Sequence, residues 1–508
     1  MGYIILLLMM SAAALHSEIL TVGTGGDGYD YDYLQQACSA AQPGDTIVVF
    51  NTGGSDGEWI ENLKGMQDKW ISIIAYEPGK VEYKGNSEAW HLVDAQYVYV
   101  HGFVFSGQTG NGVNADDGGS YGTPSKYLVF DNCTWKDMNA TGNNDQLKMS
   151  GVDYFTIKNC RFENGSAGGS QIDMVGCHLG VIENSKFING GSNAIQAKGG
   201  SSEVIIQRNW FENSGQRAIN IGGSTGAEFF RPVDADYESK QIAVFANYFI
   251  GSVAPIAFVG TVNSAVIHNT IITPGKWAIR ILQENTGKQT CSGNMFVNNI
   301  VYLTNASVNP VINIGPNTAP ETFMFANNLW YNKDNTQWAG PDLPAPETAG
   351  IYQTDPQFAD ETNYRISESS PAAGKGLNIA GLISAGIMYA DYGGAQYNNP
   401  PSVGAWEGNP PGNSAEEKPP VGLFRLEPSP ADENSLLVWD YSPNEISAEI
   451  YDLSGTNVIS KGMQLNGSSG SARLQEIFGG ATVSTGLYIL HLEINGHITA
   501  IPFIYIRK

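Results

Sequence analysis

The sequence predicts an all-β protein, a right-handed parallel β-helix (a solenoid) followed by a small C-terminal β-sandwich. Residues from about 126 to 332 repeat roughly every 22 to 30 positions, and each unit holds a β-branched run, an Asn near a turn and an aromatic residue or Ile. Each unit closes on a short strand of alternating apolar and polar residues, usually followed by Gly. Such a period with several short strands per unit is typical of a stacked solenoid. Charged residues make up only 15% of the 508 residues, whereas Gly is abundant with 60, which favours short strands over long amphipathic helices.

The repeating units align on one aromatic or aliphatic core residue per coil. These positions are Trp135, Phe162, Phe187, Phe211, Phe249, Ile272, Tyr302 and Trp330. Three residues earlier the alignment gives a column of Asn132, Asn159, Asn184, Asn269, Asn299 and Asn327, interrupted by Arg208 and Ala246. Asn tolerates the left-handed backbone conformation and bonds to neighbouring backbone groups, so we interpret this column as turn-forming.

The chain changes character outside the repeats. Residues 1–17 hold an apolar run followed by small residues, as in a secretory signal peptide. The β-helix is expected over residues 18–407, with a short helix within 31–42 protecting its open N-terminal end. A Pro-rich linker follows at 408–420, and the turn-divided apolar runs of 421–508 predict the β-sandwich. No other apolar stretch is long enough to span a bilayer.

Composition restricts the partners of the protein. A net charge of −23 argues against duplex nucleic acid as a ligand. Five cysteines without framework spacing argue against a disulfide scaffold. His91, His101, His178 and His268 lack metal-ligand spacing, and we interpret them as turn or core-edge residues away from the polar columns described next. We expect a monomer.

The closing strands of the repeats place polar residues in columns on their outward face. One column is Lys148, Asp173, Gln196, Asn220, Ala257 and Arg280, and two positions later the next is Ser150, Val175, Lys198 and Gly222. A third column, just before the strands, is Asp145, Ser170, Asn193 and Arg217. Coils of a solenoid stack about 4.8 Å apart, so these side chains should converge into one polar patch. Convergent polar groups on strands mark functional sites.

Two long loops should overhang the patch. Residues 223–239 extend one coil to 38 residues between Phe211 and Phe249, and residues 107–125 form a second insertion with Asp116 and Asp117. The first loop offers Glu228, Arg231, Asp234, Asp236 and Tyr237. Long loops on a regular scaffold usually carry function.

Several segments resemble known families. YLQQACSAAQPGDTIVVF near the start and DPQFADETNYRISESSPAAGKG to PPSVGAWEG (355–408) resemble the opening and closing coils of secreted β-helix polysaccharide lyases. Lys198, followed one coil later by Arg217, resembles the Lys/Arg pairing of the chondroitinase B and alginate lyase family. The last 85 residues or so, from LEPSPADENSLLVWD to FIYIRK, resemble the C-terminal sorting domain of Bacteroidetes type IX secretion substrates. That resemblance implies the type IX machinery as a partner, followed by attachment to the cell surface or release.

The first mechanism that this patch suggests is β-elimination on an anionic, uronic-acid polysaccharide. The sugar carboxylate must be neutralised while a base removes the C5 proton. We expect Lys198 as the base, Arg217 as the neutralising group and Tyr237 as a proton donor, with Lys148 and Arg280 binding other acidic groups. Further substrate contacts are expected from Arg231, Asn220, Gln196 and Trp277. A calcium ion would use the oxygen ligands of Asp145, Asp173, Asn144 and Asn193.

Two alternatives use the same surface. Glycoside hydrolysis needs two carboxyl groups flanking the scissile bond, for which Asp145 and Asp173 on adjacent coils are the candidates. A non-catalytic glycan-binding protein would use the patch as a groove, with Trp277 as a platform on which a sugar ring stacks.

Overall fold

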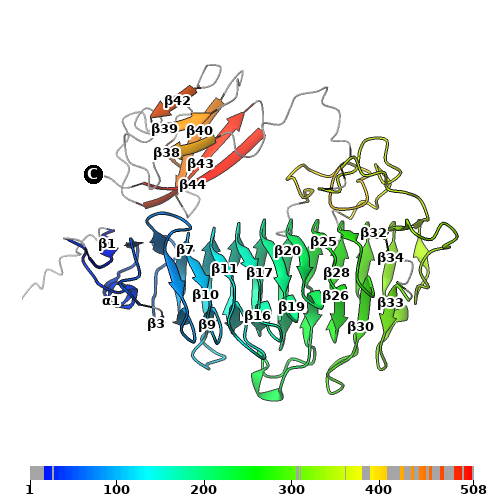
Figure 1. The fold of residues 1–508 in the computed structure, drawn as a ribbon, viewed down its shortest axis with the longest axis horizontal. Coiled ribbons are helices and arrows are strands. Elements are labelled where there is room, and N and C mark those ends of the chain that lie inside the picture. Colours follow the sequence, from blue (N-terminus) through cyan, green and yellow to red (C-terminus); the bar gives the residue numbers. More distant parts are fainter. Residues whose placement is uncertain are drawn as a thin grey trace, which may run out of the picture.

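The structure is a computed structural model (Figure 1). It describes residues 17–408 except 26–27, 56, 305–307, 309, 361 and 380–388, and beyond residue 408 it describes the strands β38 to β44. The expected signal segment and linker therefore lie outside the described residues, apart from Ser17 and Gly408.

Within the described residues, the solenoid consists of three parallel sheets, each running along its whole length. The sheet that carries the polar patch, called the patch sheet here, has the order β3-β6-β9-β12-β16-β19-β22-β26-β30-β33. Its strands are β3 Glu58–Glu61, β6 Trp90–Val93, β9 Val113–Asp116, β12 Leu147–Ser150, β16 Ser170–Val175, β19 Asn193–Lys198, β22 Arg217–Gly222, β26 Ala254–Val259, β30 Ile279–Leu282 and β33 Ile312–Ile314. The predicted parallel β-helix is confirmed.

The other two sheets complete each coil. One comprises β1 Ile19–Val22, β2 Thr46–Val49, β4 Ile71–Ala75, β7 Gln96–His101, β10 Ser125–Asp131, β13 Val152–Asp153, β14 Thr156–Lys158, β17 His178–Glu183, β20 Ser201–Gln207, β23 Ser239–Lys240, β24 Ala243–Phe245, β27 Thr261–Val262, β28 Ala265–Ile267, β31 Met295–Val297, β34 Met324–Ala326 and β36 Glu347–Thr348. The other comprises β5 Glu82–Lys84, β8 Val104–Ser106, β11 Thr134–Lys136, β15 Arg161–Glu163, β18 Lys186–Gly190, β21 Trp210–Ser214, β25 Tyr248–Ile250, β29 Thr270–Ile272, β32 Ile300–Leu303, β35 Leu329–Asn332 and β37 Ile351–Tyr352.

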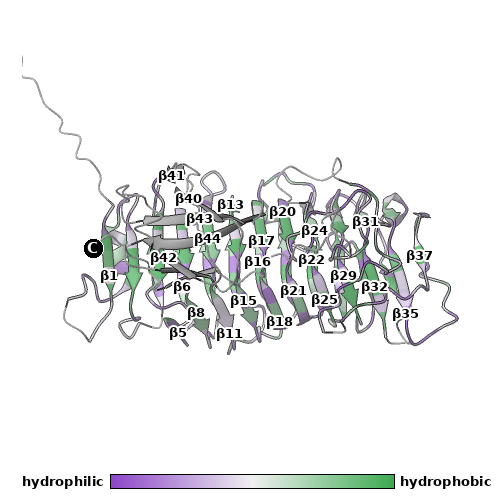
Figure 2. Cartoon of the chain, turned by 90° about the horizontal axis from the view of Figure 1, so that it is seen from above, coloured by the Kyte–Doolittle hydropathy of each residue, from purple (hydrophilic) through white to green (hydrophobic). Residues whose placement is uncertain are grey.

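Apolar side chains from successive coils stack along the inside of the solenoid. Figure 2 shows the resulting mixture of hydrophobic and hydrophilic residues along each strand. The rings of Trp135, Phe162, Phe187, Phe211 and Phe249 lie parallel, with centroids 4.6 to 4.9 Å apart. Large buried aromatic residues dominate the energy of a core, so this stack fixes the register of the middle coils.

The register predicted for the later coils is wrong by one residue. Phe249 pairs with Ile271 rather than Ile272, and Ile271 pairs with Val301 rather than Tyr302. Asn269 and Asn299 therefore do not belong to the left-handed turn column, whose members there are His268 and Asn298. The aliphatic run at 271–272 and the Val-Tyr pair at 301–302 fit the sequence pattern in either register.

A buried asparagine ladder runs beside the turn column. Its members are Asn209, Asn247, Asn269, Asn299 and Asn328. From Asn247 on, each side-chain oxygen accepts a hydrogen bond of 2.8 to 2.9 Å from the backbone N–H of the previous member. Because these polar groups are buried and paired, the ladder is structural. The turn-forming role of Asn132, Asn159, Asn184 and Asn327 agrees with their positive φ of 49° to 54°.

The two ends of the solenoid are covered. The helix α1, Leu34–Ala40, buries Leu34, Ala37 and Cys38 at the N-terminal end, within the predicted range 31–42. At the other end, Ala345 joins the inner core and Trp338 and Leu343 pack against it, while later irregular segments contribute Ala372, Tyr397 and Val403 to apolar clusters on the outer side of the later coils. Two short 3₁₀ helices, Ala227–Phe229 and Pro320–Thr322, lie in loops. All five cysteines are buried and free.

The described strands beyond residue 408 form two antiparallel sheets, as the sequence predicts for a β-sandwich. The first contains β38 Phe424–Glu427, β39 Leu436–Trp439 and β42 Gly470–Arg473. The second contains β41 Asn457–Ile459, β40 Ile446–Asp452, β43 Gly486–Ile494 and β44 His497–Tyr505. Among the described residues, no helix is long and apolar enough to cross a membrane.

Candidate functional site

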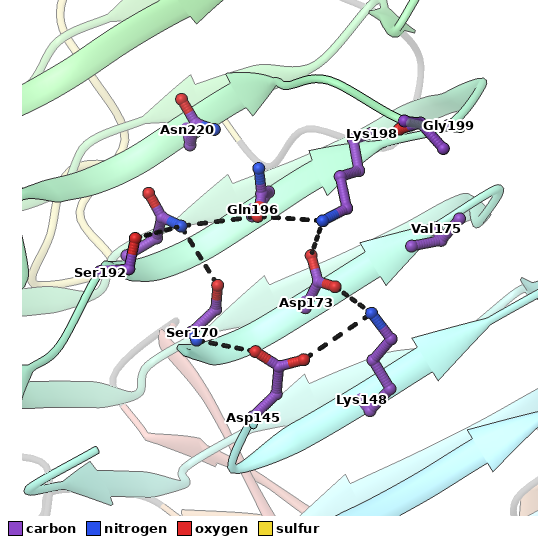
Figure 3. A network of polar contacts seen from close by, with 12 residues as sticks. Asp145, Lys148, Ser170, Asp173, Val175, Ser192, Gln196, Lys198, Gly199 and Asn220 are labelled. Carbon is purple, nitrogen blue, oxygen red and sulfur yellow. Dashed lines mark hydrogen bonds and ion pairs between the residues drawn. The ribbon is translucent and has the colours of Figure 1, made fainter. Parts of the chain in front are cut away.

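The strand register brings the predicted polar columns together. Lys148 pairs with Asp173, Asp173 with Gln196, and Gln196 with Asn220, while Ala257 pairs with Arg280. The register also joins Ser170 to Asn193 and Asn193 to Arg217. Alternation along each strand points the residues between them into the core, as Met149 and Ile195 show by being fully buried. The patch therefore lies on one face of the patch sheet (Figure 3).

The column that contains Lys148 extends further toward the N-terminus than predicted from the sequence. Lys148 pairs with Asn114, Asn114 with His91, and His91 with Trp59. His91 thus belongs to the column, and its interpretation as a residue away from the polar columns is wrong. The short strands EWIE and WHLV carry the same alternation as LKMS, but they precede the clearest repeats.

The centre of the patch is an ion-pair network built on buried Asp173. One carboxylate oxygen binds the ammonium group of Lys148, and the other lies 3.3 Å from Nζ of Lys198 (Figure 3). Lys148 Nζ also lies 3.7 Å from Asp145 Oδ2. Gln196 Oε1 accepts a hydrogen bond of 3.3 Å from Lys198. Two lysine ammonium groups are therefore held by one carboxylate.

The carboxyl groups of this network are more deeply buried than its cations. The side chains of Asp145 and Asp173 are 2% and 1% exposed, whereas those of Lys148 and Lys198 are 21% and 15% exposed. Burial, together with the charge of Asp173, raises the pKa of Asp145 to about 6. Burial alone would lower the pKa of Lys148, but the charges of Asp173 and Asp145 outweigh it and raise that pKa above its usual value.

Arg217 and Arg280 form the other end of the patch. Arg217 donates hydrogen bonds to Asn220 Oδ1 at 2.9 Å and to Glu284 Oε1 at 2.7 Å. Arg280 donates to Asn313 Oδ1 at 3.0 Å and lies 4.6 Å from the ring centroid of Trp277. Burial and the charge of Arg217 lower the pKa of Arg280.

Trp277 has two cations over its ring. Arg280 is one, and Lys276 Nζ, 4.2 Å from the ring centroid, is the other. Trp277 is the predicted platform for a sugar ring, and these two cation–π contacts already lie over its ring.

The two long loops meet beside the patch. Tyr121 of the first loop donates a hydrogen bond from its hydroxyl to the carbonyl oxygen of Glu228 in the second, and Arg231 Nε donates to the Tyr121 carbonyl at 3.4 Å. Both loops project from the same edge of the solenoid, the lower edge in Figure 1. The expectation that they overhang one cleft agrees with the pocket that both loops line, described below.

Buried Glu238 fixes the end of the second loop to the coil that carries Lys198. Its carboxylate accepts hydrogen bonds from the backbone N–H groups of Gly199 (3.1 Å) and Thr225 (2.9 Å) and from Nδ2 of Asn285 (2.7 Å). Gly199 directly follows Lys198. The carboxylate of Glu238 therefore anchors both the loop and the backbone next to this lysine. The sequence pattern contains no signal for Glu238 or for Glu284.

Three predicted site residues lie outside the network. Tyr237 is 8% exposed, packs with Phe230, Ala235 and Val262, and has Lys240 Nζ 4.6 Å from its ring centroid. Arg231 is engaged by both carboxylate oxygens of Asp153, at 2.7 and 2.6 Å. Asn144 donates from its side chain to the carbonyl oxygen of Thr141 at 2.5 Å. The remaining predicted residues lie in or beside the patch.

The proposed calcium ligands do not fit a calcium ion. Calcium takes six to eight oxygen ligands. The two carboxylates that face each other, Asp145 and Asp173, already hold the ammonium group of Lys148 between them. Asn193 donates its amide hydrogens to Ser170 Oγ at 3.2 Å rather than directing an oxygen at the carboxylates. The described residues contain no group of three or more His, Cys, Asp or Glu side chains arranged to hold a metal ion.

One family model matches part of the chain. The right handed beta helix region model covers residues 90–232, which include most of the patch, the first loop and the beginning of the second. This match agrees with the right-handed parallel β-helix predicted from the repeats. No curated protein matches the chain in sequence.

Solved structures that are similar to this chain include a pectate lyase, an alginate lyase and a polygalacturonase. The pectate lyase Pel9A is 13% identical with a TM-score of 0.48, over 78% of this chain and 97% of that one. An alginate lyase from Paenibacillus sp. str. FPU-7 is 15% identical with a TM-score of 0.34, over 66% and 99%. A polygalacturonase from Erwinia carotovora ssp. carotovora is 11% identical with a TM-score of 0.36, over 67% and 96%. At these identities the likeness concerns the fold alone.

Proposed function

We propose that this protein is an exported polysaccharide lyase that cleaves a uronic-acid-containing chain by β-elimination on the patch. The observation that carries the proposal is the layering of charge. The groups within reach of a ligand are mainly cations, Lys148, Lys198 and Arg217, while Asp145 and Asp173 lie beneath them. Such a surface attracts an anionic sugar and leaves the two buried carboxylates to position the lysines.

In this mechanism Arg217 would neutralise the uronate. Its side chain is 18% exposed and is bonded to Glu284, whose side chain is 36% exposed. A sugar carboxylate would replace Glu284 in a paired, charge-assisted contact. Neutralising the carboxylate makes the C5 proton more acidic, because the charge that develops on elimination is then stabilised.

Lys198 would act as the base that removes the C5 proton. The electron pair of the C5–H bond then forms the C4=C5 double bond, and the C4–O4 bond breaks. The leaving oxygen takes a proton from Lys148, whose ammonium form is favoured by Asp173 and Asp145. We assign this donor role to Lys148 rather than Tyr237 because both lysines bind the same carboxylate, which holds them side by side.

Glycoside hydrolysis is the second candidate, and the environment of Asp145 favours it. A carboxyl group with a pKa of about 6 beside a second carboxyl group is the pattern of an acid and base pair. Against it stands the 1% to 2% exposure of both side chains, which keeps them from a glycosidic bond.

The product distinguishes the two reactions. The whole chain is incubated with alginate, pectate, unsulfated and sulfated glycosaminoglycans and ulvan, and both ultraviolet absorbance and reducing ends are followed. We expect absorbance and reducing ends to rise together on one substrate, because β-elimination leaves an unsaturated uronate. Reducing ends without absorbance would support hydrolysis, and binding without either product would support a glycan-binding protein.

Export is part of the proposal. The signal segment at 1–17 and the resemblance of 421–508 to a type IX sorting domain support an extracellular or surface location. An enzyme outside the cell can reach polysaccharides that are too large to enter it.

A further inference from the structure

A pocket of about 510 Å³ opens on the patch sheet beside the cationic patch. Its floor comes from the ends of β3, β6, β9, β12 and β16, and its walls come from the two loops through Tyr121, Phe229 and Arg231. Val175 lines the pocket and pairs in register with Lys198 on the next strand. The pocket therefore ends one coil, about 4.8 Å, from the proposed base.

Exposed aromatic residues line this pocket. Trp59, Tyr121 and Phe229 are 49%, 44% and 58% exposed, which is unusual for large apolar side chains gathered in a concave site. The Trp59 ring lies 4.1 Å from the His91 ring, and its Nε1 donates to Glu61 Oε1 at 2.7 Å. These contacts hold the indole in place, and the apolar C–H face of a sugar ring can stack on it.

The charge of the pocket is opposite to that of the patch. Its cations are already paired, because His91 contacts Asp116 at 2.6 Å and Glu88 at 3.2 Å, and Arg231 contacts Asp153. Burial opposes the charged form of His91, but the hydrogen bonds and charges of Asp116 and Glu88 outweigh it and raise its pKa to about 9.

Two acidic side chains of the pocket form no ion pair among the described residues. Glu61 and Asp117 both line it, and in the described part of the chain neither has a cation within ion-pair distance, although the charge of Arg231 acts on Asp117 from further away. A sugar carboxylate or sulfate entering there would meet these acids without a free cation to balance them.

We propose that this pocket is a subsite for an uncharged sugar residue of the same polysaccharide chain whose uronate lies on the patch. Trp59 stacks on the sugar ring, and Glu61, Asp116 and His91 accept and donate hydrogen bonds with its hydroxyl groups. The inference rests on the proposed function for the identity of the ligand as a polysaccharide. It adds that the substrate is a heteropolysaccharide in which uncharged residues accompany the uronates.

The spacing along the sheet supports a single chain crossing both regions. Trp59 and Lys198 lie on β3 and β19, which are five strand spacings apart in the order of the patch sheet, or about 24 Å. An extended oligosaccharide of several residues spans that length. The acidic pocket and the cationic patch then set the orientation of the chain in the groove.

Binding to inactive protein tests the subsite without requiring turnover. The full chain carrying Lys198→Ala is titrated calorimetrically with oligosaccharides of six to eight residues. The uncharged set is cello-, xylo- and mannohexaose, the mixed probe is a hyaluronan octasaccharide, and the charged set is octamers of mannuronate and galacturonate. Each titration is repeated after adding Trp59→Ala, or Tyr154→Ala as the control, because Tyr154 is 46% exposed and stacks with Tyr127 on a different sheet.

We expect Trp59→Ala to weaken at least one uncharged or mixed ligand about tenfold or more and to leave the all-uronate octamers within about threefold. Tyr154→Ala should change neither. The proposal is overturned if Trp59→Ala weakens only the all-uronate octamers, or if no uncharged or mixed ligand binds in a Trp59-dependent way. If an uncharged ligand is lost while wild-type protein forms no unsaturated product, the subsite stands and the lyase reaction falls.

Discussion

The ammonium group of Lys198 lies 3.3 Å from the buried carboxylate of Asp173, one coil earlier in the solenoid. The same carboxylate binds Lys148 through its other oxygen. An aspartate that is 1% exposed cannot itself reach a polymer, so its effect on one must pass through the two lysines. The proposed chemistry follows from this arrangement, with Lys198 as base and Lys148 as proton donor.

Arg217→Gln should lower kcat/KM on a uronate polysaccharide about 100-fold, because the developing charge loses a stabilising partner. The same variant should lose far less on the methyl-esterified polysaccharide, whose carboxyl groups carry no charge. Steady-state rates on the two substrates check this. Glu284→Gln is the matched control, since it removes the negative charge of the 2.7 Å partner of Arg217 and should not reduce binding of the acidic substrate. Equal losses on both substrates would argue against carboxylate neutralisation.

Asp145→Asn should stabilise the protein at pH 8 more than at pH 4. The pKa of Asp145 is raised from 3.8 to about 6, so the stabilisation that accompanies the protonated carboxyl group is present below about pH 4 and is lost as the pH rises through 6. A shift of this size corresponds to roughly 3 kcal/mol. The asparagine mimics the neutral acid and can still accept the 2.7 Å hydrogen bond from the Ser170 N–H. Thermal unfolding midpoints of both proteins across pH 4 to 8 measure the difference.

Asp131→Asn is the control for Asp145→Asn, because the pKa of Asp131 is shifted in the opposite direction. Burial would raise the pKa of Asp131, but the hydrogen bond from His101 and the charge of Lys158 outweigh it and lower that pKa. Its contribution is therefore present above the unfolded pKa, near 4, and is lost as the pH falls through the lower folded value. Asp131→Asn should destabilise the protein at pH 8 and have less effect in strong acid. A pH-independent effect of both variants would contradict the assigned environments.

Chelation should leave the protein unchanged. Because Lys148 occupies the space between Asp145 and Asp173, these carboxylates have no room for calcium. We expect the same turnover and the same unfolding midpoint after dialysis with and without EDTA. A loss restored by calcium, but not by magnesium at the same ionic strength, would show a site that these residues do not explain.

Asn269→Ala should destabilise the solenoid by about 2 kcal/mol or more, because it leaves the buried N–H of Asn247 without its partner and removes the side-chain hydrogen bond to the carbonyl oxygen of Val244. Asn184→Gly is the matched control, because Asn184 is exposed at a turn with φ of 51°, a conformation that glycine adopts readily. Chemical denaturation of both variants gives the comparison. Similar losses would mean that the buried ladder contributes no more than the turn column.

The repeat allowed most of the fold and the columns of the patch to be predicted from sequence. In middle coils the period-two alternation of LKMS, IDMV and IQAK places Lys148, Asp173 and Gln196 on one face, and the observed register agrees. In later coils, runs such as Ile271-Ile272 satisfy the pattern in two registers, and the alignment slipped by one.

The contacts of individual side chains could not be predicted in this way. Periodicity gives the face of a strand but not the partner of a long side chain, so the pairing of Arg231 with Asp153 and the packing of Tyr237 under its loop were missed. Trp59 and His91 were missed because the first coils lack the Asn of the turn column, although Tyr83 and Phe105 continue the aromatic column of Trp135.

The role of Lys198 is the central claim, and separating binding from turnover in one variant tests it most directly. On the polysaccharide that wild-type protein converts, Lys198→Ala should bind within about threefold of wild type and form unsaturated product at least about 100-fold more slowly. The variant lacks the base for removal of the C5 proton, while the remaining cations still bind the polysaccharide. Undiminished formation of unsaturated product by Lys198→Ala would contradict the account.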